Sequence, residues 1–181
     1  MGNTMKLAHP FALVMIATLA QGLLAEETRY GLQAHADLPL GDLKTFADSH
    51  RGLGFGVHQT IDFLDGNMVR PRLDYIRFPE ATLTTGRQSA SSLSLGADYL
   101  YFFEGKPEHF YLTLGLAATR WSLGTKTAAL DSTHDTTRVI TAFGFGYQWS
   151  AALGTELRLT NSKVSSTFKG NTLQAGVTLR F

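Results

Sequence analysis

The sequence predicts an all-β protein, an eight-stranded antiparallel up-and-down transmembrane β-barrel preceded by a cleavable signal peptide. Three observations predict this fold. Eight segments alternate apolar and polar residues with a period of two, which is the period of a half-buried strand. The connections between them alternate between long and short, and the one long apolar run lies at the N-terminus. The 181 residues fit a single domain, and a chain without cysteine has no disulfide or thiolate chemistry.

Residues 1–25 are predicted to be the signal peptide. Lys6 supplies its positive start, and residues 11–20 form an apolar stretch of the length that such peptides use. Small residues offer cleavage after Ala25 or, as the alternative, after Ala20. A membrane-anchor helix is disfavoured because it needs about 20 apolar residues, and polar residues flank this shorter run.

Residues 26–181 are predicted to form the barrel domain, and no helix is expected in it. The alternation is cleanest at the C-terminus, where every second residue from Leu173 to Phe181 is apolar. Pro71 weakens the third segment because proline cannot donate to a ladder, so we expect a bulge or local unpairing there. The eight segments span residues 30–38, 53–63, 69–78, 93–103, 110–119, 139–149, 153–160 and 173–181.

The connections alternate in length from the first strand onward. Short turns are expected at residues 64–67, where Asp65 and Gly66 are a hairpin pair, at 104–108 and at 150–151. Long loops are expected at residues 39–50, 79–88, 122–135 and 161–170. Outer-membrane barrels have this arrangement, with long extracellular loops and short periplasmic turns.

The apolar faces are predicted to contact lipid and the polar faces to line the lumen. The polar faces are rich in Gly, Ser, Thr and Ala, which suit the narrow interior of an eight-stranded barrel. The charges on the apolar faces are Arg51, Arg77 and Arg120, all expected at the extracellular rim. A lipid-facing Arg costs about 0–1 kcal/mol there, against roughly 2–4 kcal/mol at the midplane.

Arginine and carboxylate residues share the polar faces, and we expect them to pair because a guanidinium binds a carboxylate bidentately. The predicted lumen ion-pair network consists of Asp37, Asp62, Arg72, Asp74, Asp98, Arg138, Glu156 and Arg158. Arg29, Arg70 and Arg180 lie on the same faces. Such a network contributes little net stability and mainly avoids unpaired buried charge.

Aromatic residues are expected to mark the two membrane interfaces. The predicted periplasmic girdle consists of Tyr30, Tyr101, Phe103, Phe110, Tyr147, Trp149 and Phe181. Tyr75 and Trp121 are predicted to lie towards the outer interface.

The pattern resembles the small eight-stranded outer-membrane barrels of the OmpA/OmpX type. Their last strand carries an assembly signal, polar-x-Gly-x-x-hydrophobic-x-aromatic, which Gln174, Gly176, Leu179 and Phe181 match. The resemblance covers residues 28–181 and implies the outer membrane of a Gram-negative bacterium. It implies outer-membrane lipid, lipopolysaccharide and the barrel-assembly machinery as partners.

Several groups of residues could be taken for metal, catalytic or phosphate-binding sites, but a structural interpretation is favoured for each. His35 and His58 both face the lumen, yet about five residues along the strands separate them, on the order of 16 Å, too far to share a zinc ion. Residues 131–135, Asp-Ser-Thr-His-Asp, are interpreted as a flexible solvated loop that lacks the rigid frame of a triad. The glycine runs at 52–56 and 144–146 precede no helix, so they are interpreted as lumen or bulge glycines inside strands. No cofactor, metal or catalytic residue is therefore predicted.

The favoured function is structural, or surface interaction through the loops, and a narrow or gated small-solute channel is the main alternative. An enzyme acting on envelope lipid and a soluble lipocalin-like carrier are less favoured. The formal net charge of +1 gives no field for nucleic acid. The oligomeric state is left open.

Overall fold

The computed structural model describes residues 28–64, 66–84, 86–103 and 109–181. The predicted signal peptide, Asp65 and the predicted turn at 104–108 lie outside the described residues. Within the described part of the chain, no helix has the length and apolar character needed to cross a membrane.

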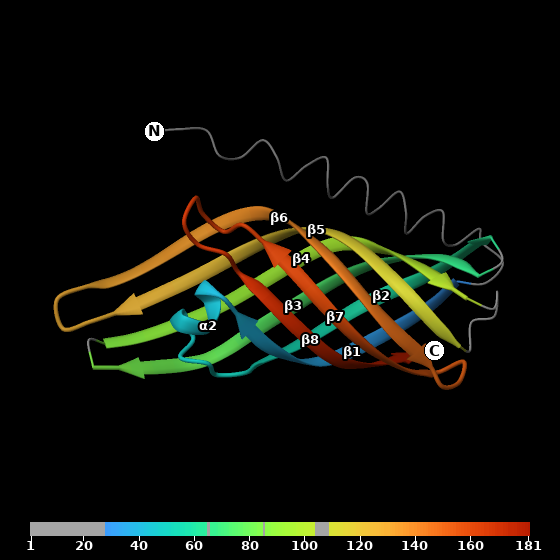
Figure 1. The fold of residues 1–181 in the computed structure, drawn as a ribbon, viewed down its shortest axis with the longest axis horizontal. Helices are drawn as coiled ribbons and strands as arrows, with labels where there is room; N and C mark the ends of the chain where they lie inside the picture. The colour runs from blue at the N-terminus through green and yellow to red at the C-terminus, as the bar shows by residue number, and fades with distance from the viewer. Residues whose placement is uncertain (1–27, 65, 85, 104–108) are drawn as a thin grey trace.

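The described residues form a closed barrel of antiparallel strands, in which each strand pairs with its neighbour in sequence and β8 pairs with β1 (Figure 1). The strands are β1 (Thr28–Leu40), β2 (Gly52–Leu64), β3 (Asn67–Leu83), β4 (Gly86–Phe102), β5 (Phe110–Lys126), β6 (Asp131–Gln148), β7 (Leu153–Ser162) and β8 (Asn171–Arg180). The predicted strand number and topology are therefore confirmed.

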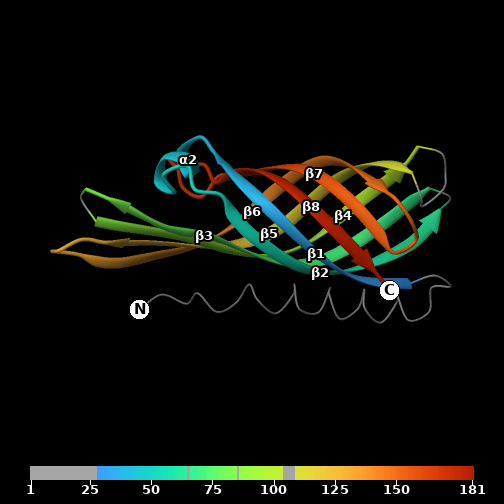
Figure 2. The ribbon, with the colours of Figure 1, turned by 90° about the horizontal axis from the view of Figure 1, so that it is seen from below.

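The stagger of the strands tilts them around the barrel. Following paired residues once around, from Thr28 through β2 to β8, returns to β1 at Leu38, ten residues along the strand. The C-terminus and the turn between β6 and β7 lie at one end, here called the terminal end (Figures 1 and 2). The opposite end, with the helix and the longest hairpins, is called the loop end.

Two of the predicted long loops are strands. β4 pairs with β5 as far as Arg87 and Lys126, and β5 pairs with β6 as far as Asp131, so residues 79–88 and 122–135 are mostly paired. The pairing of β2 with β3 ends at Arg77, and that of β6 with β7 ends at Ile140. Beyond these points β3 to β6 form one four-stranded sheet that extends past the barrel, here called the protruding sheet (Figure 2).

The prediction of a domain without helix is wrong at one short segment. Helix α2 (Asp42–Phe46) lies in the connection between β1 and β2. It is five residues long, far shorter than the windows in which helical periodicity becomes visible. Its Leu43 is fully buried, so tertiary packing stabilises this turn of helix.

Pro71 lies inside the continuous strand β3. On the β2 side, the register runs to His58 and Arg72 and resumes at Ile61 and Val69, so pairing is interrupted beside the proline. This is the local unpairing expected from the missing N–H.

Candidate functional site

The barrel is apolar outside and polar inside, as predicted. Leu53, Phe55 and Phe143 are more than half exposed on the outer wall. The polar residues that point inward are buried and include His35, Asp37, His58, Arg70, Arg72, Asp74, Asp98, Thr113, Arg158, Gln174, Thr178 and Arg180. This is the reverse of a soluble carrier, which would place its oily residues inside.

Asp98 of β4 is the centre of the charged lumen. Its Oδ2 accepts from Nη2 of Arg70 at 2.8 Å, and its Oδ1 accepts from Nη2 of Arg158 at 2.6 Å. Nε of Arg72 lies 3.1 Å from Oδ2, so three guanidinium groups surround one carboxylate. The exposed fraction of the Asp98 side chain is 0%, and only close pairing makes such a charge tolerable.

Glu156 of β7 joins this cluster from the other side of the barrel. Nη2 of Arg70 donates to its Oε2 at 2.7 Å and to its Oε1 at 3.0 Å. The hydroxyl of Tyr111, on β5, donates to Oε2 at 2.9 Å. Arg70 thus links β3 to β7 through the lumen, and the cluster crosses the barrel interior.

Asp37 and Asp74 lie nearer the loop end, and Asp74 shares Arg72 with the Asp98 cluster. Asp37 accepts from Nε2 of Gln174 at 2.8 Å and lies 2.7 Å from Nδ1 of His35. Asp74 pairs with Arg72 and accepts from Nε2 of Gln33 at 3.0 Å. Asp37 and Asp74 are therefore each bonded by two side chains.

Of the other predicted network members, Arg138 lies outside the lumen, whereas Asp62 pairs with the inward Met68 and lies on the lumen face. Arg138 is exposed, and its Nε donates to the carbonyl of Val164 at 3.1 Å, because β6 has left the barrel wall at this height. Asp62 is half-exposed and lies nearer the terminal end than Arg70. Arg70 itself was predicted only to share the lumen face, and it is the residue that joins Asp98 to Glu156.

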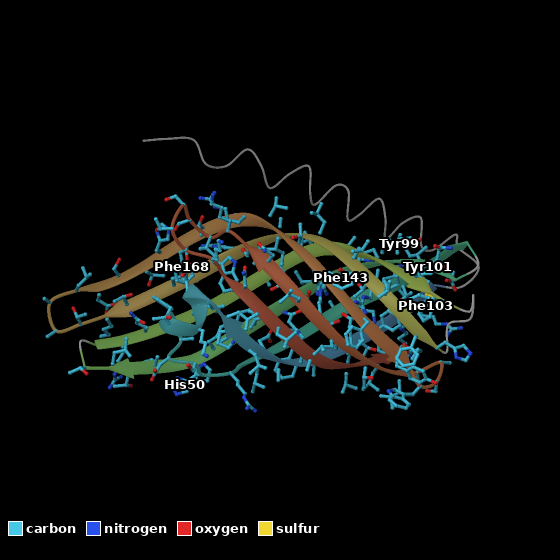
Figure 3. All side chains as sticks on the ribbon, in the orientation of Figure 1. His50, Tyr99, Tyr101, Phe103, Phe143 and Phe168 are labelled. Atoms are coloured by element: carbon cyan, nitrogen blue, oxygen red, sulfur yellow. The ribbon has the colours of Figure 1, made fainter. Side chains whose placement is uncertain are left out.

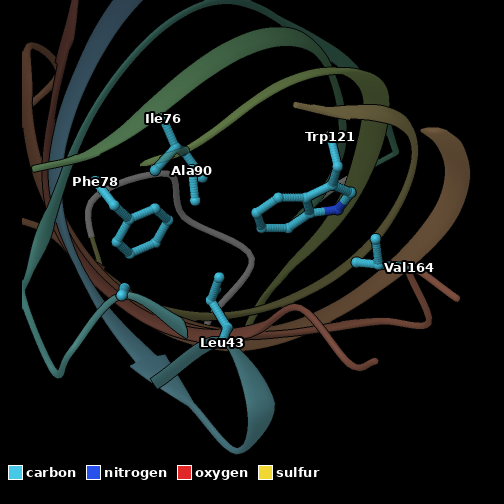
Figure 4. Packing of buried hydrophobic residues seen from close by; sticks show 7 residues of the cluster. Leu43, Ile76, Phe78, Ala90, Trp121 and Val164 are labelled. Atoms are coloured by element: carbon cyan, nitrogen blue, oxygen red, sulfur yellow. The ribbon is translucent and has the colours of Figure 1, made fainter. Parts of the chain in front are cut away.

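Apolar side chains fill the lumen at the loop end. Leu43 and Ala47, on and beside α2, pack with Phe78, Trp121 and Val164 inside the barrel mouth (Figure 4). Nε1 of Trp121 donates to the hydroxyl of Ser162 at 3.1 Å. The prediction that Trp121 faces the outer interface is therefore wrong; it follows Arg120, which faces outward, so strand alternation points it inward.

The terminal end has an apolar layer of its own. Met68, Leu100, Phe102 and Tyr111 form a second buried cluster. Between this layer and the apolar mouth lie the charged cluster and a layer of hydroxyl groups, in which Ser94 bonds Thr119 and Thr160 bonds Thr172, both at 2.8 Å. Two of the cavities along this interior have volumes of about 10 Å³, roughly room for one water each.

The candidate chemical groups do not form a reactive site. His35 faces Gly54 and His58 faces Gly31, four residues apart along the strands, so the two histidines remain separate. Among the described residues no group of three His, Asp or Glu side chains could hold a metal ion. Residues 131–135 lie in β6 rather than in a flexible loop, and Asp135 binds Arg120 at 2.8 Å on the exposed outer side. The glycine runs at 52–56 and 144–146 lie in β2 and β6, as predicted.

Aromatic residues gather on the outer wall near the terminal end. Tyr99, Tyr101 and Phe103 lie there, whereas His50 and Phe168 lie near the loop end (Figure 3). Tyr147 stacks edge-on against Phe110 and Trp149, with ring centroids 4.7 Å and 4.6 Å apart. The residues of the predicted assembly signal share β8 and its end: Gln174 points inward, and Leu179 and Phe181 are exposed.

Comparisons with solved structures identify the fold. The N-terminal β-barrel domain of Pseudomonas aeruginosa OprF superposes with a TM-score of 0.64 at 14% identity, over 84% of this chain and 97% of that one. Ail, the attachment invasion locus protein of Yersinia pestis, gives 0.64 at 13% identity, over 85% and 97%. Neisserial surface protein A gives 0.56 at 16% identity, over 85% and 97%. No family model and no curated protein matches the sequence. The chain therefore has the fold of small eight-stranded outer-membrane barrels.

Proposed function

We propose that the protein is an integral outer-membrane β-barrel of a Gram-negative bacterium that acts at the cell surface through its protruding sheet. The main observation in support is that the outer surface of the barrel differs from that of the protruding sheet. Exposed apolar residues surround the barrel, whereas the protruding sheet carries exposed ion pairs such as Arg87 with Glu80 at 3.3 Å and Lys126 with Asp131 at 2.9 Å. An apolar belt suits lipid, and ion pairs suit water.

The protruding sheet offers an open edge. β6 pairs with β7 only up to Ile140, so residues 131–139 have a strand neighbour on the β5 side alone. Unpaired edges present backbone N–H and C=O groups to which an extended segment of another protein can add. Yersinia Ail, which shares the fold, is named for attachment, and surface attachment is one function such an edge would serve.

The membrane assignment is tested by fractionation and by gel electrophoresis of boiled and unboiled samples. The chain should be found in the detergent-soluble envelope fraction and should migrate differently when unheated. A tag inserted between Ala128 and Ala129, at the tip of the β5–β6 hairpin, should be detected on intact cells. A soluble periplasmic band without a heat shift contradicts the proposal.

The surface role is tested by shortening the β5–β6 hairpin to a two-residue turn that joins Ser122 to Asp135. These residues are paired in the sheet, so the barrel below them should still fold and shift with heat. Attachment of expressing cells to other cells should decrease. A matched variant that shortens the β3–β4 hairpin keeps the β6 edge and should retain attachment; equal loss in both contradicts a role for that edge.

The surrounding lipid, lipopolysaccharide and the barrel-assembly machinery are the proposed partners. Gln174, Gly176, Leu179 and Phe181 would present the assembly signal before the barrel closes. In the folded barrel Gln174 binds Asp37, so the two uses of this side chain would follow one another.

A further inference from the structure

The outer wall is hollowed where β6, β7, β8, β1 and β2 run side by side. The hollow has a volume of about 990 Å³. Its floor lies at the seam between β8 and β1, where Ala36 pairs with Ala175 and Ala34 pairs with Val177. All three alanines are exposed and point outward, so only methyl groups cover the backbone at these positions.

Large side chains border this hollow on both sides. On β2, Leu53 and Phe55 are each 63% exposed. On the other side stand Tyr147 and Trp149, and Nε1 of Trp149 donates to the hydroxyl of Thr155 at 3.1 Å. This hydrogen bond fixes the indole at the border of the hollow, on the β7 side.

We infer that this hollow binds one acyl chain of a membrane phospholipid. The inference rests on the proposed function, because the wall faces lipid only if the barrel spans a membrane. The side chains that point into the hollow are hydrocarbon, apart from the Tyr147 hydroxyl and the bonded pair of Trp149 and Thr155. Water would find few partners there, and the volume is within the roughly 300–1,000 Å³ of ligand sites.

The shape favours a chain over a second copy of the barrel. The residues that line the hollow follow a paired row obliquely from Phe110 to Phe55, so it extends across β5, β6, β7, β8, β1 and β2. A second convex barrel would meet Phe55 and Trp149 before its backbone reached the alanines. A flexible acyl chain fits between these borders.

The position identifies the leaflet. Tyr147 and Trp149 belong to the aromatic group near the terminal end, and such residues lie at the level of lipid headgroups. A chain entering beside them comes from the leaflet nearer the terminal end, with its headgroup beside Trp149.

Native mass spectrometry of the protein extracted from envelopes in mild detergent tests this site. The unmodified protein should retain one phospholipid. The double variant Ala36→Phe and Ala175→Phe fills the floor and should retain none. The control Ala97→Phe and Ala118→Phe adds the same side chains to outward positions of β4 and β5, outside the hollow, and should retain one.

A second measurement needs no substitution in the floor. The chain has two tryptophans, so Trp121→Phe leaves Trp149 as the only one. In vesicles that contain a small fraction of brominated phospholipid, the fluorescence of Trp149 should be quenched more than expected if lipids contacted the protein at random. Quenching at the random level contradicts the site.

The remaining outcomes separate the two proposals. A chain recovered in the soluble fraction overturns the proposed function and this site together. A heat-shifting barrel that retains no lipid, or retains it equally in the floor variant, overturns the site alone. A dimer that the floor variant abolishes shows that a second copy occupies the hollow and also overturns it.

Discussion

Asp98 accepts hydrogen bonds from Arg70 and Arg158 and forms an ion pair with Arg72, and its side chain has no exposed surface. Asp98→Asn leaves three buried guanidinium groups with too few carboxylates. Breaking a buried ion pair by removing one partner costs about 3–5 kcal/mol, so we expect the free energy of unfolding to fall by that amount. Urea titration of the barrel in detergent micelles, followed by tryptophan fluorescence, measures it.

Asp135→Asn is the matched control. Asp135 binds Arg120 on the exposed outer side, and the bonds from Arg120 and Ser122 hold the pKa of this carboxyl below its usual range. Exposed pairs contribute little, so the free energy of unfolding at neutral pH should stay at the wild-type value. Similar losses in the two variants would show that burial does not determine the contribution of these pairs.

Gly115 leaves the space that the central ion pair occupies. A methyl group at this position would collide with the carboxylate of Asp98 and the guanidinium of Arg158. Gly115→Ala should lower the free energy of unfolding by about 1–3 kcal/mol, the usual cost of overpacking, in the same urea titration. In Gly124→Ala the nearest atom is the hydroxyl of Ser89, which can rotate away, so a loss as large as that of Gly115→Ala would contradict this explanation.

At the residue scale, strand alternation predicted which side chains enter the lumen but not which of them meet. Arg70 reaches Glu156 across the barrel because the stagger of the strands brings β3 and β7 to one height. The alternation of apolar and polar residues along a strand does not reveal this stagger. Arg138 has the inward parity, but β6 has separated from β7 at that point. Because Arg120 faces outward, the alternation of the strand places the next residue, Trp121, inside the barrel.

At the element scale, α2 is held by the residues it inserts into the barrel mouth. Leu43→Ala in a Trp149→Phe background should loosen this packing, since Leu43 and Trp121 belong to one buried cluster. The emission of Trp121 should shift to longer wavelength and become quenchable by acrylamide. Leu116→Ala changes an outward residue of β5 and should leave the Trp121 emission unchanged; a shift there would point to global loosening.

Elements were predicted well where one face is apolar and poorly where both faces meet water. Residues 110–119 and 139–148 alternate because one face points into the barrel and the other forms its apolar outer wall, and both segments lie in strands. The continuations at 122–126 and 131–138 have polar residues on both faces, so their composition is that of a loop. These continuations are strands because residues 122–126 pair with β4 and residues 131–138 pair with β5. A local sequence pattern does not show such partner strands.

At the scale of the whole molecule, the interior is filled in layers, from the apolar cluster at the loop end to the apolar cluster at the terminal end. Ions crossing it would have to displace the Asp98 cluster and two apolar layers. Planar-bilayer recording of the refolded protein should show no stepwise conductance. Steps that persist in purified, heat-shifting material would favour the channel alternative.

β6 extends well beyond its last partner on β7, and under the proposed function this extension would stand out from the cell surface. From Ile140 to Asp131 the strand continues for nine residues, which at about 3.4 Å each is a reach of roughly 30 Å along its axis. In the proposed orientation, the tilted strand would carry its tip outward from the membrane by somewhat less than this. Macromolecules too bulky to approach the bilayer could still contact this hairpin. The depth of any surrounding carbohydrate would then determine which of them can reach it.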